Sequence, residues 1–350
     1  MTGKQTFGTA VALLIAAATV GCDQPGPPPS PEVPVHHVES AETVVSTESG
    51  LIAAGSGIHV DASGAVWISD RIDHRVLSVD PEGEELVSWG REGEGPGELQ
   101  RPEGVAVSDN EVIVLDFQNR RVQAFGLDGE YLRSVPVPTQ PALPASLNRR
   151  GEVAFSVGGR DGSLIGFLNV EDGEVILMGE ARASPPTAIS QIAIDEQVER
   201  REIPVEFQNH VLPVVGDDGS IWVVVQSEGT VKRYGRDGEI LWSTPLPEGD
   251  VRQAHETFFR RWEAEGLRGF PVPWTVSAGT AHEGELFLLL QTDEGGRSVL
   301  LRVEGETGVI ESRIMLPVPP PAGPMAIDGA RGWLYLLVPD DARLIRMRLP

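Results

Sequence analysis

The sequence predicts an all-β protein, a six-bladed β-propeller in which each blade is a four-stranded antiparallel sheet. The first observation is an internal repeat, because segments 70–76 (DRIDHRV) and 116–122 (DFQNRRV) share one pattern at a spacing of 46 residues. A repeat of about that length is typical of stacked or radial arrangements of small structural units. The second observation is that strand-like runs with turn residues recur along the remaining chain and bring the number of units to six.

The first two units each resemble four short strands joined by tight turns. Apolar or alternating runs are separated by turn residues, among them Asp128-Gly129, which tolerate positive φ angles. The expected strands are 57–61, 65–68, 75–79 and 85–89 in the first unit, and 104–108, 112–115, 121–125 and 131–135 in the second.

The later units are less regular, but each keeps one strand with its turn. These signatures are the runs 151–155, 219–225, 284–290 and 332–337. The alternative is a β-sandwich or two smaller β domains, but a strand-rich period that continues through the chain favours the ring. Such a ring is a single domain despite its length.

The last unit contains only three expected strands, 325–328, 333–338 and 344–348, before the sequence stops at Pro350. The alternating stretch 42–47 lies ahead of the first unit and offers a fourth strand. Pairing it with the last unit would remove two exposed sheet edges at once. We therefore predict that residues 42–47 close the ring.

The segment between the two regular units is rich in glycine, from Gly90 to Pro102, and precedes Gly104-Val-Ala-Val. Together with the pattern Asp116-x-x-Asn-x-Arg-Val, it resembles NHL-type repeats and TolB-like six-bladed propellers over about residues 55–135. In the repeat itself, the aspartates 70 and 116 and the arginines 75 and 121 are expected to brace each blade as buried or half-buried ion pairs.

The amino terminus resembles a bacterial lipoprotein signal. An apolar stretch from Gly8 to Val20 is too short to span a bilayer and leads to Thr19-Val20-Gly21-Cys22, which resembles a lipobox with threonine in place of the usual leucine. We expect a signal peptide over 1–21, lipidation of Cys22, a Pro-rich tether over 22–37 and a propeller over 38–350. The alternative is an ordinary cleaved signal with an accidental cysteine.

Charge narrows the possible partners. The chain has 28 basic and 52 acidic residues, a formal net charge of -24, which argues against binding to nucleic acid or to anionic lipid. We therefore expect a monomer in the bacterial cell envelope, in the periplasm or on the cell surface, that touches the membrane only through its N-terminal lipid.

Two connections exceed the regular repeat. The distance is 65 residues from Gly173 to Gly238 and 70 from Gly238 to Gly308, against 46 in the regular copies. The second excess predicts an amphipathic helix at about 250–266, because its apolar side chains recur at helical spacing. They include Val251, Ala254, Phe258, Phe259 and Trp262. The first excess, 181–207, is compatible with a long loop or a short helix.

Functional residues in propellers are expected near the starts of the innermost strands. Arg101, Asn209, His210 and Trp274 occupy such positions and are our candidates for a polar, aromatic-lined channel mouth that binds a ligand. No catalytic residue can be named, and the seven histidines do not suggest a set of three converging metal ligands.

Two functions follow as hypotheses. The favoured one is a non-catalytic binding scaffold for a protein, peptide or glycan, without a cofactor. The alternative comes from the family resemblance, which implies that some such propellers hold calcium or zinc in the central channel and act as lactonase-like hydrolases or as lyases. The inserted helix would then form part of the cover over the site.

Overall fold

The structure is a computed structural model that describes residues 33–137, 142–169, 173–184, 189–266, 272–320, 323–338 and 341–350. The expected signal peptide, Cys22 and the first part of the tether lie outside these residues. Within them, no helix combines the length and the apolar character needed to cross a membrane.

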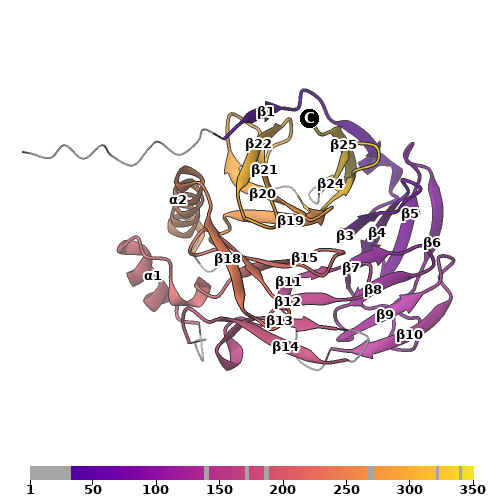
Figure 1. Ribbon diagram of the computed structural model, residues 1–350, viewed down its shortest axis with the longest axis horizontal. Helices are drawn as coiled ribbons and strands as arrows, with labels where there is room; N and C mark the ends of the chain where they lie inside the picture. Colours follow the sequence, from indigo (N-terminus) through magenta and orange to yellow (C-terminus); the bar gives the residue numbers. More distant parts are fainter. Residues whose placement is uncertain are drawn as a thin grey trace, which may run out of the picture. The chain divides into compact units, whose positions relative to one another are not determined.

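The described chain forms six sheets, and each contains four antiparallel strands that correspond to one blade (Figure 1). The strands of blades 1 to 3 are β3 (Gly55–Val60), β4 (Val66–Asp70), β5 (Arg75–Val79) and β6 (Glu85–Trp89); β7 (Pro102–Val107), β8 (Val112–Asp116), β9 (Arg121–Phe125) and β10 (Tyr131–Pro136); and β11 (Ala142–Leu147), β12 (Val153–Ser156), β13 (Ser163–Leu168) and β14 (Val175–Glu180). The predicted four-strand pattern of the first two units is confirmed.

Blades 4 to 6 follow the same order along the chain. Their strands are β15 (Val211–Val215), β16 (Ile221–Val225), β17 (Thr230–Tyr234) and β18 (Ile240–Pro245); β19 (Val276–His282), β20 (Glu285–Asp293), β21 (Ser298–Val303) and β22 (Ile310–Leu316); and β23 (Met325–Asp328), β24 (Trp333–Val338) and β25 (Arg343–Arg348), to which β2 (Glu42–Val45) adds the fourth strand. The fold is therefore the predicted six-bladed β-propeller.

The first strand of each blade lines the axis of the ring. Strands β3, β7, β11, β15, β19 and β23 contact one another in that order, and β23 contacts β3 again. The ring is therefore closed. In Figure 1 the labelled strands β3, β7, β11, β15 and β19 gather in the middle, while β6, β10 and β14 lie toward the outside. We call the side where the first strands begin the entry face, and the side where they end in hairpins the exit face.

The predicted closure of the ring is confirmed. Strand β2 pairs antiparallel with β25, with Glu42 opposite Arg346 and Val45 opposite Leu344. The Val45 side chain is 2% exposed and belongs to an apolar cluster that joins blade 6 to blade 1. This burial attaches the N-terminal strand to the core as well as to the sheet edge.

A second N-terminal strand was not predicted. Strand β1 (Val35–His37) pairs in parallel with β22, with Val35 opposite Arg313. These three residues are the end of the segment that we expected to be a free tether, and the structure attaches them to blade 5. The runs of polar and proline residues around them conceal a strand this short.

The core lies between neighbouring blades rather than within one. One cluster joins blades 4 and 5 and contains Trp222 and Leu288, both without exposed surface. Each sheet is only four strands wide and would expose its apolar faces if it stood alone, so burial between blades holds the ring together.

Both long connections contain helices. Helix α2 (Glu248–Glu265) confirms the predicted insertion helix, and helix α1 (Gln191–Glu199) shows that the first excess contains a short helix. Three single turns of 3-10 helix complete the described elements: η1 (Thr47–Ser49), η2 (Arg160–Gly162) and η3 (Val205–Phe207).

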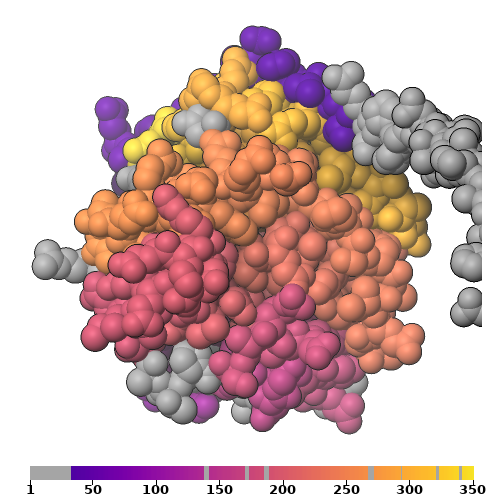
Figure 2. Space-filling model, turned by 90° about the vertical axis from the view of Figure 1, so that its left-hand side faces the viewer, coloured from indigo at the N-terminus to yellow at the C-terminus, as the bar shows by residue number. Residues whose placement is uncertain are grey.

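The two helices pack on each other. Their shared cluster consists of Ile194, Val198, Phe207, Phe258, Phe259 and Trp262. Trp262 Nε1 also donates a hydrogen bond of 2.7 Å to Asp195 Oδ1. Figure 2 shows the crimson surface that contains α1 adjoining the orange surface that contains α2. Because each helix lies between the last strand of one blade and the first strand of the next, both belong to the entry face.

Candidate functional site

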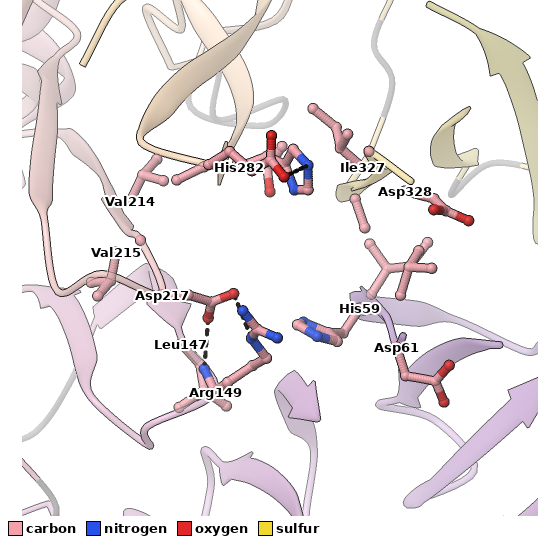
Figure 3. Close-up of a pocket in the computed structure, with 18 of the residues that line it drawn as sticks. His59, Asp61, Leu147, Arg149, Val214, Val215, Asp217, His282, Ile327 and Asp328 are labelled. Atoms are coloured by element: carbon pink, nitrogen blue, oxygen red, sulfur yellow. Dashed lines mark hydrogen bonds and ion pairs between the residues drawn. The ribbon is translucent and has the colours of Figure 1, made fainter. Parts of the chain in front are cut away.

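A cavity of about 790 Å³ lies on the ring axis and opens at the exit face (Figure 3). All six blades contribute to its lining, blade 2 through Val105 of β7 alone and the other five through the ends of their first strands and the hairpins that follow. Its polar and charged members are His59, Asp61, Ser146, Arg149, Asp217, Asp218, Thr280, His282, Glu283 and Asp328. A volume of this size suits a small organic molecule or a short segment of a polymer.

Several of these polar groups occur here because hairpin turns need them. Asp61 Oδ1 accepts hydrogen bonds from the backbone N–H groups of Ser63 and Ala65, at 2.9 and 3.0 Å. Asp218 Oδ1 accepts one from Ser220 N at 2.9 Å. Such aspartate turns stabilise a sharp reversal of the chain. Their repetition around the ring brings carboxylates together at the mouth of the cavity.

An ion pair crosses from blade 3 to blade 4 at this mouth. Arg149 donates to Asp217 twice, from its backbone N to Oδ1 at 3.0 Å and from Nε to Oδ2 at 2.6 Å. The Arg149 and Asp217 side chains are 49% and 38% exposed. The terminal nitrogens Nη1 and Nη2 of Arg149 have no hydrogen-bond partner among the described residues, and Figure 3 shows the guanidinium pointing toward His59.

His59 faces this pair from blade 1. Burial lowers the pKa of its imidazole to about 4; Asp217 and Asp61 oppose the shift and the Arg149 charge adds to it. One ring nitrogen bonds to the backbone of Val107, which fixes it as the donor and leaves the other as an acceptor. His59 is therefore a neutral, oriented ring at pH 7.

The opposite wall carries His282, Glu283 and Asp328. His282 Nε2 lies 4.0 Å from Glu283 Oε1. Asp328 Oδ2 accepts a hydrogen bond of 3.0 Å from Arg331 Nη1. Carboxylates thus outnumber cations at the mouth, where Arg149 is the one lysine or arginine among the described lining residues.

Deeper in the cavity the walls are aliphatic. The apolar lining includes Ile58, Val105, Leu147, Val214 and Ile327. No phenylalanine, tyrosine or tryptophan occurs among the described residues that line it. The cavity therefore combines a charged mouth with a small-chain aliphatic interior and offers no ring for stacking.

The four residues predicted to bind a ligand lie at the entry face, and none of them lines this cavity. Asn209 is 4% exposed, and its side chain is bonded to backbone. Its Oδ1 accepts from Arg182 N at 2.8 Å and its Nδ2 donates to Ala183 O at 2.7 Å. These contacts make Asn209 a clamp that holds the connection containing α1.

His210 and Trp274 are brought together. Their ring centroids are 6.0 Å apart, and Phe207 lies 5.5 Å from His210 on another side. Burial lowers the pKa of His210 to about 4, and its Nδ1 has no hydrogen-bond partner among the described residues. This aromatic pair adjoins the cluster between α1 and α2 through Phe207.

Arg101 belongs to another blade and does not join this pair. Its φ angle is 51°, its backbone N donates to His74 Nδ1 at 3.0 Å, and its Nη2 lies 3.5 Å from Glu103 Oε1. The entry face therefore holds a two-residue aromatic group on blades 4 and 5 and a separate ion pair on blade 2.

Sequence reasoning missed the exit-face cavity and its residues Arg149, Asp217, His282 and Asp328. Each follows or ends the first strand of a different blade, so the residues are far apart in sequence and share no spacing pattern. The only sequence evidence for this cavity is that polar residues follow the first strand in most units. Ordinary turns also place polar residues there, so this pattern does not identify a site.

No group of three or more histidine, cysteine, aspartate or glutamate side chains that could hold a metal ion occurs among the described residues. The cavity does contain potential ligands of both kinds, imidazole and carboxylate.

Comparisons with known proteins agree with this architecture. The NHL repeat family model matches residues 99–125, which contain β7, β8 and β9 of blade 2. A comparison with curated protein sequences finds no match.

Similar solved structures are propellers of different functions. A streptogramin B lyase is 11% identical with a TM-score of 0.50, and the match covers 89% of this chain and 98% of that one. A luciferin-regenerating enzyme is 14% identical with a TM-score of 0.50, covering 88% and 96%. A structural genomics protein of unknown function from Bacteroides thetaiotaomicron VPI-5482 is 13% identical with a TM-score of 0.53, covering 88% and 75%.

At these identities the likeness shows the fold alone. Residues 99–125 thus match the NHL repeat model, and the described residues form a six-bladed β-propeller as a closed ring.

Proposed function

We propose that this protein is a binding scaffold of the bacterial cell envelope that holds part of a protein, peptide or glycan in its central cavity. The observation that carries this proposal is the cavity of about 790 Å³ on the ring axis, with a charged mouth made by residues at the strand ends and hairpins of blades 1, 3, 4, 5 and 6. Packed sheets form a rigid scaffold that can position polar groups on the connecting loops for binding.

The state of the charged groups favours binding over catalysis. A general base works best when its pKa lies near the working pH, whereas the pKa of His59 is about 4. Asp217, the carboxylate that opposes this shift most, is already bonded to Arg149. The mouth is thus suited to orient a ligand by hydrogen bonds and charge.

The proposed location rests on the amino terminus. A lipid on Cys22 would tie the chain to a membrane, and the Pro-rich residues that follow would hold the ring away from its surface. The net charge of -24 disfavours direct contact with anionic lipid. The membrane would then be reached only through the lipid, and no nucleic acid would bind.

The alternative is a hydrolase or lyase that depends on calcium or zinc. The observation that favours it is the presence of His59, His282 and Asp217 in one cavity, since imidazole and carboxylate are the ligand types of such sites. Metal analysis of the purified protein separates the two. Stoichiometric metal, together with a loss of thermal stability in chelator, would support the enzyme.

The binding function can be tested with a variant that fills the cavity. Thr280 lines it from β19, and Thr280→Trp would occupy its interior, whereas Glu239→Trp adds the same ring to an exposed turn outside the cavity. Wild-type protein should capture a component from peptide libraries, envelope glycans or envelope proteins, and Thr280→Trp alone should lose it. Equal capture by all three proteins would contradict the proposal.

A further inference from the structure

We propose that the central cavity binds a zwitterionic ligand of the amino acid or short-peptide class, with the ligand carboxylate held by Nη1 and Nη2 of Arg149. This inference rests on the proposed binding function and narrows it to one ligand chemistry. Four properties of the cavity lead to it: an open guanidinium edge, a neutral imidazole, an excess of carboxylates and aliphatic walls without aromatic rings.

The guanidinium of Arg149 is held in place by Asp217, yet its two terminal nitrogens have no hydrogen-bond partner among the described residues. Its Nε donates to Asp217 Oδ2 at 2.6 Å, while Asp217 Oδ1 is anchored by the Arg149 backbone N at 3.0 Å. This double attachment orients the group and leaves both terminal nitrogens open to the cavity, where Figure 3 draws them. Two parallel N–H groups in a planar fork match the two oxygens of a carboxylate.

His59 does not act as a second cation beside Arg149. Its ring is neutral at pH 7, and its N–H is committed to the backbone of Val107. The remaining nitrogen is an acceptor, so it can receive an N–H from a ligand but cannot attract an anion. The positive charge available to an anionic group is therefore confined to the edge of Arg149.

The rest of the mouth repels simple anions. Asp61, Asp218 and Glu283 join Asp217 around Arg149, the one arginine of the described lining, whereas Asp328 is already paired with Arg331. The chain has a net charge of -24. A ligand with only negative charge could place one group on Arg149, but the rest of it would be repelled by the remaining carboxylates. A ligand that also carries an ammonium group can place the carboxylate on Arg149 and its positive end toward the remaining carboxylates.

The interior distinguishes a peptide from a glycan. Leu147, Val214 and Ile327 present small aliphatic surfaces, and the described lining contains no aromatic side chain. Sugars are commonly held on aromatic faces, which this cavity does not supply, whereas aliphatic walls suit the side chains of amino acids. The volume of about 790 Å³ leaves room for more than one residue.

The test is isothermal titration calorimetry of the purified chain with trialanine at pH 7. Trialanine should bind, and trialanine amide, which lacks the carboxylate, should bind about tenfold more weakly or worse because the charge-assisted pair is lost. Succinate, which carries two negative charges, and cadaverine, which carries two positive ones, should each bind more weakly than trialanine.

Variants locate the contact. Arg149→Gln should weaken trialanine binding to the level of the amide, and Arg149→Lys should restore it only in part because lysine lacks the fork. Arg150→Gln is the matched control, since Arg150 is the adjacent exposed arginine and does not line the cavity. Unchanged melting curves for these variants would show that the ring is intact.

Three outcomes would overturn the inference: equal affinities for trialanine and its amide, equal losses in Arg149→Gln and Arg150→Gln, or no binding of trialanine. If the cavity-dependent capture described above still occurs in any of these cases, the binding function survives and only the ligand class is wrong. If that capture is also absent, both proposals fail.

Discussion

Asp116, the aspartate of the NHL repeat in blade 2, is fully buried and is held by charge and by backbone together. Arg121 Nε donates to its Oδ2 at 2.7 Å, and Gln100 N donates to its Oδ1 at 2.7 Å. Asn119 Nδ2 and Gln123 Nε2 also donate to Oδ2, at 2.8 and 3.1 Å. The ion pair expected from the repeat is thus present in this copy, where it joins β8, β9 and the glycine-rich connection.

The ion pair expected between Asp70 and Arg75 in blade 1 is wrong, because Asp70 is satisfied by backbone N–H groups and Arg75 pairs with Asp73. Asp70 is equally buried but accepts backbone N–H groups from Ala53 and Ala54, at 2.7 and 3.1 Å. Arg75 instead lies 3.2 Å from Asp73 and donates to Leu51 O. The two repeats therefore share the same strands and turn but satisfy the buried carboxylate differently, by an arginine in blade 2 and by backbone N–H groups in blade 1.

Replacing Asp116 with alanine should destabilise the fold strongly. The change leaves Arg121 and Gln123 without their buried partner, and the loss of one member of a buried pair costs about 3–5 kcal/mol. Chemical denaturation measures the difference in unfolding free energy. Asp73→Ala is the control, because its pair with Arg75 is partly exposed and should contribute about 1 kcal/mol or less. Similar losses for both variants would show that the buried network is unimportant.

Acid should destabilise the ring through its buried histidines. The pKa of His210 is about 4 in the folded protein because of burial, against 6.5 ordinarily. Above pH 6.5 the ring is neutral in both states, so nothing is lost. Between 6.5 and 4 the unfolded chain takes up a proton that the folded chain refuses, and stability falls by at most about 1.4 kcal/mol per pH unit.

His210→Phe removes the imidazole that takes up this proton and keeps an aromatic ring in contact with Phe207 and Trp274. Its stability should therefore decline less steeply from pH 6.5 to 4 than that of the wild type, as measured by urea denaturation at several pH values. His36→Gln serves as control because His36 is exposed on β1. An unchanged slope in His210→Phe would mean that this histidine is protonated in the folded state.

At the scale of elements, helix α2 is attached to the ring by charge at its start and by packing along its length. Asp250 is 4% exposed and accepts from Arg313 of β22 at 2.6 and 2.8 Å. Thr292 Oγ1 of β20 donates to the same carboxylate at 3.2 Å. The first turn of α2 is thereby fixed to blade 5, while Phe258 and Trp262 pack against the α1 segment.

Asp250→Ala should loosen α2 without opening the ring. Hydrogen exchange should become faster in the first turns of α2, because Arg313 loses its buried partner and the helix loses its anchor. Glu256→Ala is the control, since Glu256 is 58% exposed and lies 3.6 Å from Arg201. Unchanged exchange in Asp250→Ala would show that the apolar cluster alone holds the helix.

The sequence predicts helix α2 but does not decide whether the α1 segment is a loop or a helix. The number of apolar side chains that each helix buries explains this difference. Helix α2 buries Ala254, Phe258, Phe259 and Trp262, a stripe that recurs at helical spacing. Helix α1 buries only Ile194 and Val198, which is too little periodicity to distinguish it from a loop. Its helical state depends on packing against α2, which the local sequence does not contain.

At the scale of the whole molecule, closure of the ring depends on the four-residue strand β2, which completes the sixth blade. Val45 fills a cluster with Leu344 and Tyr335 and leaves 2% of its surface exposed. Neighbouring Thr43 is exposed on the same strand. Substitutions at Val45 and Thr43 therefore distinguish a loss of burial from a change on the exposed side of the same strand.

Val45→Asp should lower the melting temperature by several degrees, since it places an unpaired charge in the core at a cost of about 3 kcal/mol or more. Thr43→Asp should change it little. Deleting residues 38–50 should lower it further, and an unchanged melting curve after that deletion would rule out a stabilising role for β2. Thermal scans by circular dichroism measure all three.

Anchoring should depend on a single sulfur. If Cys22 carries a lipid, Cys22→Ser should move the protein from the membrane fraction to the soluble fraction of bacterial cells, because a serine cannot accept the thioether-linked group. Val45→Asp provides a control for misfolding alone. Soluble wild-type protein, or membrane-bound Cys22→Ser, would contradict the proposed attachment.

The number of blades and the closing strand could be predicted because repeated turns and strand patterns are local properties. The cavity could not, because Arg149, Asp217 and His282 come from three blades and meet only when the ring closes. The candidates His210 and Trp274 do meet, but on the opposite face. Position relative to the axis is a property of the complete ring and not of any one repeat.

Closure also imposes an order of events on the growing chain. Strand β2 is synthesised long before its partner β25 (Arg343–Arg348). It therefore stays unpaired until the ribosome has added residues 343–348. Throughout synthesis, two strand edges remain open to other chains. A polypeptide cut short before Arg343 would keep both edges exposed, and we expect such fragments to be captured by chaperones or to aggregate.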